Sequence, residues 1–440
     1  MAGNSQQSLV APERPEKYGY QYGFGNTFVS EARPDAVPKT QNNPQKAPFG
    51  LYAEQLSGTA FTVPRKGNQR TWLYRMQPGV THHEFKKTNL GRMLVPTVID
   101  PNQKRWEPFP IPEEPHTFVE GLVCICGAGG PETRAGIRNY IFTATLSMEK
   151  ASFYNSDGDF LIVPQEGSLD IQTEMGFLEV RPGEICVIQR GISFAVRVEG
   201  PTRGYICEVY GHFQLPDLGP IGANGLANTR DFMHPVAAHD PPSQGEYRMY
   251  NKFMDDIFVS EMDHSSFNVV GWWGNYVPYK YDLKRFSTMN SVAFDHPDPS
   301  IFTVLTCPTT EPGVAACDFV IFPQRWMVAE GTFRPPYFHR NCMAEFMGLI
   351  YGSYDAKEGF RAGGASLHNF CTPHGPDTVT YDKASTAELS PERYADTLAF
   401  MFETSFMLKL TDFSANTSLE PHYPRVWHGL TNRYEPEEEA

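Results

Sequence analysis

The chain has 440 residues, of which 40% are hydrophobic and 20% are charged, a composition typical of a soluble globular protein with a sizeable core. Its formal net charge of −14, with no basic stripe to offset it, argues against nucleic acid or an anionic membrane as a partner. No apolar run reaches the roughly 20 residues that span a bilayer, the polar start lacks a signal-peptide core, and eight cysteines are too sparse for a disulfide scaffold, so we predict a cytoplasmic protein with reduced thiols.

The predicted elements are mainly short strands separated by turns, as 37 glycines and 37 prolines suggest. Residues 1 to about 110 show little periodicity and are predicted to form loops and short strands. From about 115 to 210, short β-rich runs are broken by DG, EG, PGE and RG turns. Frequent turns between short strands indicate a sandwich or barrel.

A second β-rich block is predicted from about 286 to 375, after a stretch with one helix near 246–256. The segment ELSPERYADTLAFMFE is the best helix candidate, because Ser390 can cap it and Pro391 suits the first helical position. We therefore expect a mainly β fold with few helices and two barrel or sandwich (jelly-roll) units. The expected division is a domain of residues 1–280, with its unit at about 115–210, and a domain of residues 281–440.

The two β-rich blocks share a spacing of residues. The second block contains the pattern H-x-N-x3-E-x6-G, formed by His339, Asn341, Glu345 and Gly352. At the same relative offsets the first block carries Tyr154, Ser156, Phe160 and Gly167. Gly183 and Gly363 each stand 11 residues before a further matching pair, Phe194 and His374. The spacing predicts a duplicated unit with aromatic residues in one copy and metal-competent residues in the other.

His339 and Glu345 need a turn between them to meet. Six residues put them on largely opposite faces of a helix, or roughly 20 Å apart along a strand. A turn at Arg340–Cys342 would return Glu345 beside His339, and His374 would come from a later strand end. Two imidazoles and one carboxylate suit a non-heme Fe(II) oxygenase, although zinc with the same ligands would indicate hydrolysis instead.

Most other histidines fall in no paired spacing and are predicted to be structural. His368, six residues before His374, is a candidate partner for a ligand imidazole. His296 lies in a proline-fixed turn between Asp295 and Asp298, where it could exchange a proton at neutral pH.

The shared framework resembles the two motifs of the cupin superfamily, with Asn341 standing where that signature has a second histidine. Longer strings resemble the homogentisate 1,2-dioxygenase family over nearly the whole chain. They include GFGNTFVSEA, APFGLYAEQLSGTAFTVPR, DGDFLIVPQEG, GNYVPYKYDL, FDHPDPSIFTVLT, PPYFHRNCMAEFMGLIYG and TPHGPD.

This resemblance implies a bicupin in which the first unit has lost its metal ligands and the second has kept them. It implies an Fe2+ enzyme that converts homogentisate and O2 to maleylacetoacetate in tyrosine and phenylalanine catabolism, and a hexamer built as a dimer of trimers. It makes His339, Glu345 and His374 iron ligands. His296 becomes the catalytic base or hydrogen-bond partner of a substrate hydroxyl, and Tyr354 and His374 become substrate contacts. Asn341 is expected to lie behind the ligands and to help orient substrate or oxygen, and His368 is expected to be the partner of a ligand imidazole.

Two alternatives remain open at this point. A gentisate-type dioxygenase tends to use histidines alone, so Glu345 argues against it. A non-catalytic bicupin would lose the ligands of both units, whereas this chain keeps one set. Because the substrate is anionic, Arg334 or Arg340 is a hypothetical source of local positive charge.

Overall fold

The computed structural model describes residues 15–91, 95–217, 226–289, 293–295, 298–354 and 356–435. Strands dominate these ranges and helices are few, so the predicted mainly β fold is confirmed. None of the helices in these ranges is long and apolar enough to cross a membrane.

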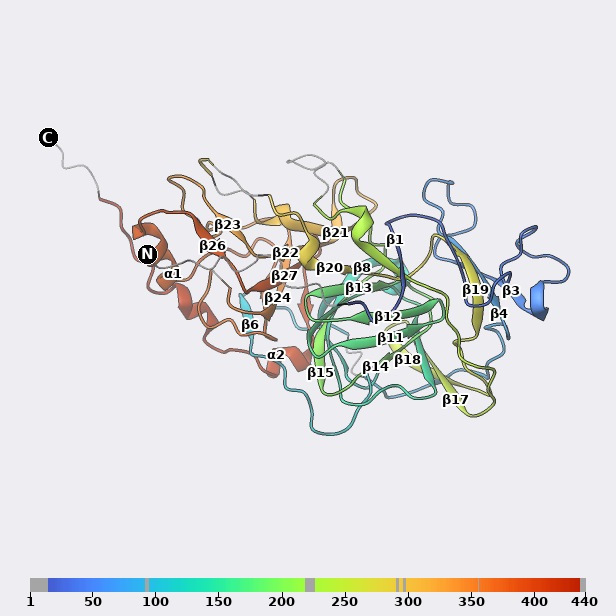
Figure 1. Ribbon diagram of the computed structural model, residues 1–440. Coiled ribbons are helices and arrows are strands. Elements are labelled where there is room, and N and C mark those ends of the chain that lie inside the picture. The colour runs from blue at the N-terminus through green and yellow to red at the C-terminus, as the bar shows by residue number, and fades with distance from the viewer. Residues whose placement is uncertain are drawn as a thin grey trace, which may run out of the picture.

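A nine-stranded sheet lies between two other sheets and forms the centre of the molecule (Figure 1). Its strands, in spatial order, are β1 (Tyr20–Tyr22), β16 (Phe232–Pro235), β20 (Tyr279–Asp282), β13 (Glu184–Ile188), β10 (Asp159–Glu166), β15 (Thr202–Val209), β8 (Ala135–Ala144), β7 (Leu122–Gly130) and β28 (Lys409–Leu410). One face packs on a seven-stranded sheet of β12 (Gly176–Val180), β11 (Leu169–Thr173), β14 (Phe194–Arg197), β9 (Ala151–Asn155), β17 (Tyr247–Phe253), β18 (Asp256–Met262) and β5 (Lys86–Lys87).

The other face packs on a six-stranded sheet that belongs mainly to the C-terminal part of the chain, at the left of Figure 1. Its strands are β21 (Thr303–Pro308), β22 (Ala315–Phe322), β27 (Leu398–Thr404), β24 (Ala344–Tyr351), β25 (Ala365–His368) and β6 (Lys104–Trp106). A four-stranded sheet at the right end contains β2 (Phe28–Glu31), β19 (Val269–Gly274), β4 (Arg70–Arg75) and β3 (Tyr52–Ser57). The remaining elements are the pair β23 (Arg325–Met327) and β26 (Glu392–Tyr394), the helices α1 (Thr378–Thr386) and α2 (Asp412–Asn416), and six short 3-10 turns at Pro48–Gly50, Pro131–Thr133, Thr229–Asp231, Leu283–Arg285, Pro299–Phe302 and Tyr423–Trp427.

Strand β10 shows why the central sheet is buried on both faces. Phe160 and Ile162 point into the core shared with the seven-stranded sheet, and Leu161 and Val163 point into the core shared with the six-stranded sheet. Successive side chains of a strand alternate between faces, so a strand covered on both sides is a continuous apolar run. The sequence FLIV is such a run, and all four residues are buried.

The two units repeat the same strand pairing. In the first unit β10 lies between β13 and β15, and Phe160 is paired with Ile188 and Glu208. In the second unit β24 lies between β25 and β27, and Glu345 is paired with His368 and Glu403. Thus Glu345 occupies the place of Phe160, as the spacing predicted.

A buried lysine lies beside the aromatic core of the first unit. The Lys252 ammonium is fully buried and contacts carboxylates of Asp157, Glu208 and Asp255. Glu208 corresponds to Glu403 of the second unit in the strand pairing. The first unit therefore carries an internal cation held by its own carboxylates.

The two units also exchange strands. From the first part of the chain, β6 pairs with β25 and extends the six-stranded sheet. From the last part, β28 pairs with β7 at the edge of the central sheet. The predicted division into residues 1–280 and 281–440 remains a prediction.

The predicted helices at 388–403 and near 246–256 are wrong. The first region forms β26 and β27, and the second forms β17 and the turn into β18. Every residue of β27 is buried, because the strand lies between β22 and β24. Such a fully buried strand shows no alternation, and a favourable cap before it does not decide between helix and strand. The helix that does form, α1, is capped by Asp377, whose carboxylate accepts the Thr380 amide at 2.7 Å.

Candidate metal centre

Two chain segments that carry histidines run side by side next to the six-stranded sheet. The amide of His339 donates to the carbonyl of His374 at 2.9 Å, and the amide of His374 donates back at 3.0 Å. This antiparallel pair holds the two imidazoles edge to face, with their centroids 4.2 Å apart. The Asn341 side chain closes the turn before β24 by accepting the amide of Met343 at 3.1 Å.

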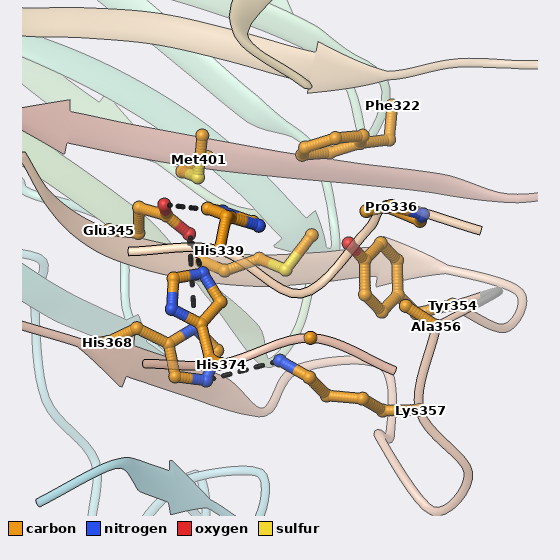
Figure 2. A pocket seen from close by; sticks show the side chains of 12 residues that line it. Phe322, Pro336, His339, Glu345, Tyr354, Ala356, Lys357, His368, His374 and Met401 are labelled. Carbon is orange, nitrogen blue, oxygen red and sulfur yellow. Dashed lines mark hydrogen bonds and ion pairs between the residues drawn. The ribbon is translucent and has the colours of Figure 1, made fainter. Parts of the chain in front are cut away.

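Glu345 lies on the face of β24 that is turned away from the central sheet, because its neighbour Phe346 packs into the core between the sheets. Its Oε2 is 2.9 Å from Nε2 of His374, and its Oε1 is 3.4 Å from Nε2 of His339. Within the described ranges, these three residues form the one group of three or more His, Cys, Asp or Glu side chains whose potential ligand atoms all lie within 4.8 Å of one another (Figure 2). The structure thus brings together the three residues that the spacing singled out.

The hydrogen bonds of the two imidazoles leave them ready to bind a cation. Nδ1 of His339 lies 2.7 Å from the Tyr337 carbonyl, and Nδ1 of His374 lies 2.9 Å from the Thr372 carbonyl. Because a carbonyl only accepts, each Nδ1 carries the hydrogen and each Nε2 of a neutral ring presents its lone pair. Both lone pairs face the Glu345 carboxylate, so the three side chains converge on a place for positive charge.

The pKa values in the group follow the same electrostatics. Burial alone raises the pKa of the Glu345 carboxyl, but the surrounding histidines outweigh it and hold that pKa well below its usual value. Burial lowers the pKa of His339, yet its bonds to Glu345 and the Tyr337 carbonyl raise it overall. The buried carboxylate is therefore ionised, as a ligand of a divalent metal must be.

Asn341 links Glu345 to a second buried carboxyl. Its Nδ2 lies 3.4 Å from Oε1 of Glu345 and 3.2 Å from Oε1 of Glu403, the residue opposite Glu345 on β27. Glu403 also accepts the Ser300 hydroxyl at 2.6 Å. Burial is the main cause that raises the pKa of Glu403 to about 7. The bond from Ser300 opposes this rise, and the charge of Glu345 adds to it. A histidine at position 341 has no NH2 group, so it could not donate hydrogen bonds from one nitrogen atom to both carboxyl groups.

His368 lies behind the group, on β25. Its ring stacks on His374 with centroids 4.1 Å apart, and its Nδ1 is 3.9 Å from Oε2 of Glu345. On its other side, Nε2 is 2.9 Å from the Tyr423 hydroxyl and 3.1 Å from the Lys357 ammonium. His368 therefore joins the triad to a polar cluster formed by the C-terminal segment.

The triad forms one wall of a pocket with apolar and polar sides (Figure 2). The apolar side consists of Phe322, Pro336, Met347 and Met401. Tyr354 and Lys357 line it as well, and Lys357 is 7% exposed. Burial lowers the pKa of Lys357 to about 7. The pocket thus combines an apolar wall with a few polar groups, as small-molecule sites commonly do.

The sequence did not point to Lys357. It is buried because Tyr423 and Trp427 pack over it, with their ring centroids 5.9 and 5.8 Å from its ammonium. No local spacing connects position 357 with positions 423 and 427. No signal in the sequence could therefore have indicated this cluster.

The two arginines that were hypothesised to supply charge lie elsewhere. Arg334 donates to the carbonyls of Ala329 and Ser390, and Arg340 is exposed. Neither lines the pocket. His296 lies outside the described residues. Two residues further on, Asp298 accepts the hydroxyl of Tyr337 at 2.6 Å. This bond joins Asp298 to the segment that carries His339.

Two β units share the central sheet, and one of them carries the His–Glu–His donor set. At the corresponding positions the other unit has Phe153, Phe160 and Phe194: Phe194 is paired with Phe153 as His374 is paired with His339, so the predicted counterpart of His339, Tyr154, is wrong by one residue. The chain is therefore a bicupin, with one potential metal site within its described residues. The chain belongs to the homogentisate 1,2-dioxygenase family: models of the N-terminal and C-terminal parts of this family match residues 19–283 and 284–434.

Curated relatives named homogentisate 1,2-dioxygenase agree with this assignment. The one from Dictyostelium discoideum is 61% identical over 419 residues, covering 94% of this chain and 97% of its own. The one from Homo sapiens is 54% identical over 431 residues, covering 95% and 97%. Among solved structures, a Bacillus subtilis oxalate decarboxylase mutant covers 75% of this chain and 84% of its own, with 10% identity and a TM-score of 0.29.

Proposed function

We propose that the protein is an Fe2+-dependent, extradiol-type ring-cleaving dioxygenase that converts homogentisate and O2 to maleylacetoacetate, a step of tyrosine and phenylalanine catabolism. The observation that carries the proposal is the donor set itself. Two imidazole nitrogens and one carboxylate converge on one point, and both imidazoles are fixed through their Nδ1 atoms. Membership of the family and relatives of that name over nearly the full length support the substrate.

The proposed ligands are His339, Glu345 and His374, a set typical of non-heme Fe(II) oxygenases. When bound, Fe2+ would supply open positions and electron density for a chelating phenolate and dioxygen. Both oxygen atoms enter the product, so the reaction consumes no external reductant. One carboxylate leaves a net positive charge on the centre, which favours an anionic substrate.

The remaining residues of the pocket are proposed to bind and orient the substrate. Tyr354, which lines the pocket opposite Glu345, would donate a hydrogen bond from its hydroxyl (Figure 2). Asn341 and His368 would hold Glu345 and His374 in position. The apolar wall would exclude water around the ring.

His296 is proposed to accept or hold a phenolic proton of the substrate. Support comes from the described chain beside it. Asp298 bonds to Tyr337 and Ser300 bonds to Glu403, so residues 298–300 are anchored to both sides of the triad.

Oxygen uptake by the anaerobically loaded protein tests the proposal. Loading with Fe2+ should give about one iron per chain, and homogentisate should then trigger oxygen uptake together with the absorbance of the ring-opened product. Zinc-loaded protein should show neither signal. Faster turnover of gentisate than of homogentisate, or activity without oxygen, would contradict the proposal.

Removing the positive charge of Lys357 should weaken substrate binding. We expect Lys357→Met to raise KM for homogentisate by roughly ten- to a hundredfold with a smaller effect on kcat, because charge-assisted contacts contribute roughly 1.5–3 kcal/mol. Steady-state kinetics of oxygen uptake measures this. Lys383→Met, at an exposed position of α1, is the matched control and should leave KM unchanged.

The proposal also includes a hexamer, built as a dimer of trimers, and a cytoplasmic location. Light scattering coupled to size-exclusion chromatography measures the first, and fractionation of cells measures the second. A monomer at micromolar concentration would contradict the assembly.

A further inference from the structure

Two cysteines face each other beside the metal centre. Cys342 follows Asn341 in the segment that carries His339, and Cys371 lies in the segment that carries His374. The amide of Cys371 donates to the Asn341 carbonyl at 2.9 Å. His339 is paired antiparallel with His374, so moving three residues away from this pair along each segment leads to Cys342 and Cys371.

Their thiols are close and accessible. Desolvation, followed by the nearby Cys342 thiol, raises the pKa of Cys371. Both cysteines are exposed, whereas the other six of the chain are buried. Cys371 has a φ of 58°, a left-handed conformation that cysteine rarely adopts, so the turn alone does not account for a cysteine there.

We propose that Cys342 and Cys371 form a reversible disulfide that joins the two segments carrying His339 and His374. The Cys371 amide bonds to the carbonyl of the residue before Cys342, which brings the two Cα atoms near the roughly 4.4–6.8 Å that a disulfide spans. The oxidant is a low-molecular-weight disulfide. The Cys342 thiolate attacks it and releases one thiol, and the Cys371 thiolate then attacks the sulfur of Cys342 in the mixed disulfide and releases the second. Two protein thiols and one disulfide thus give one protein disulfide and two thiols.

The disulfide has a consequence for the metal centre. The two histidine segments are joined at the triad by backbone hydrogen bonds, and a covalent link three residues away opposes their separation. Loss of the metal requires the two imidazoles to leave it. Oxidation therefore slows metal release, a consequence that depends on the proposed function, whereas formation of the disulfide does not.

Peptide mass spectrometry of the full-length protein tests the disulfide. The protein is treated with oxidised glutathione, denatured, alkylated and digested with trypsin, which cuts after Arg340, Lys357, Arg361 and Lys383. The two cysteines then lie in separate peptides, 341–357 and 362–383. We expect these peptides to be linked, two hydrogen atoms lighter than their sum, and both cysteines to become alkylated again after reduction. Glutathione adducts on both cysteines without a link, or two free thiols, would overturn the proposal.

The rate at which a chelator removes Fe2+ tests the consequence for the metal. Oxidised protein should release iron several-fold more slowly than reduced protein, and Cys342→Ser and Cys371→Ser should release it at the reduced rate under both conditions. Equal rates for oxidised and reduced wild-type protein would overturn the effect on the metal. The linked peptides and the oxygen-uptake assay are separate readouts, so failure of the disulfide and failure of the dioxygenase activity can be distinguished.

Discussion

Glu345→Gln should abolish stable metal binding and lower kcat/KM for homogentisate by more than about 100-fold, since even substitutions behind the ligands of metal sites cost 10–100-fold. Glu345 provides the one negative charge of the donor set, and it is buried between two histidines. A neutral amide would leave two imidazoles to hold a divalent ion, and its NH2 group would face them. Iron content after anaerobic loading and gel filtration measures the first effect, and oxygen uptake measures the second.

Glu403→Gln is the matched control. Glu403 lies opposite Glu345 on the neighbouring strand and is also buried, but it does not belong to the group that converges on one point. An amide oxygen can still accept the bonds from Ser300 and Asn341. Its iron content should stay close to wild type. Equal loss of iron in both variants would mean that the charge of this sheet face, rather than ligation by Glu345, retains the metal.

Lys252→Met should lower the stability of the first unit by about 3–5 kcal/mol, the cost of leaving buried charges without their partner. The ammonium lies 3.0 Å from Oε1 of Glu208 and 3.3 Å from Oδ1 of Asp255, and it also contacts Asp157. Burial by itself lowers the pKa of Lys252, but these carboxylates raise it above its ordinary value, so the charged form is retained. Urea unfolding followed by circular dichroism should show the loss as a lower midpoint.

Lys87→Met provides the comparison for an exposed ion pair. Lys87 contacts Asp256 at 2.7 Å, but their side chains are 59% and 44% exposed. Solvent-exposed pairs contribute little, so the midpoint should shift by an amount equivalent to less than about 1 kcal/mol. Shifts of the same size in the two lysine variants would show that burial of Lys252 does not determine the stability of the cluster.

The convergence of the triad could be predicted because it depends on a few distinctive residues at fixed offsets. The spacing predicted both the turn between His339 and Glu345 and the position of His374 beside them. The first unit repeats this spacing with Phe160 and Phe194. The mainly β architecture could be predicted from turns and short apolar runs. The interpretation failed at β27, where burial on both faces removes the alternation that distinguishes a strand from a helix.

The polar environment of the triad could not be predicted in the same way. Lys357 is buried by rings from positions 423 and 427, and Glu403 meets Asn341 only because β27 lies beside β24. Such contacts join segments that are tens of residues apart, and no pattern in the sequence relates these lysine and glutamate residues to their partners. The hypothetical roles of Arg334 and Arg340 came from proximity in sequence, which is a weak guide to which cation faces a pocket.

The exchanged strands have a consequence for the order of events during synthesis. Strand β6 leaves the ribosome about 260 residues before its partner β25, and the separation between β7 and its partner β28 is larger still. The first unit therefore has an unfilled sheet edge at β7 until nearly the whole chain has emerged. The last exchanged strand, β28, follows His374, so iron can enter a fully closed scaffold only after translation is almost complete. Truncated chains that end before residue 409 should expose the edge of β7 and aggregate, even though they contain all three proposed ligands.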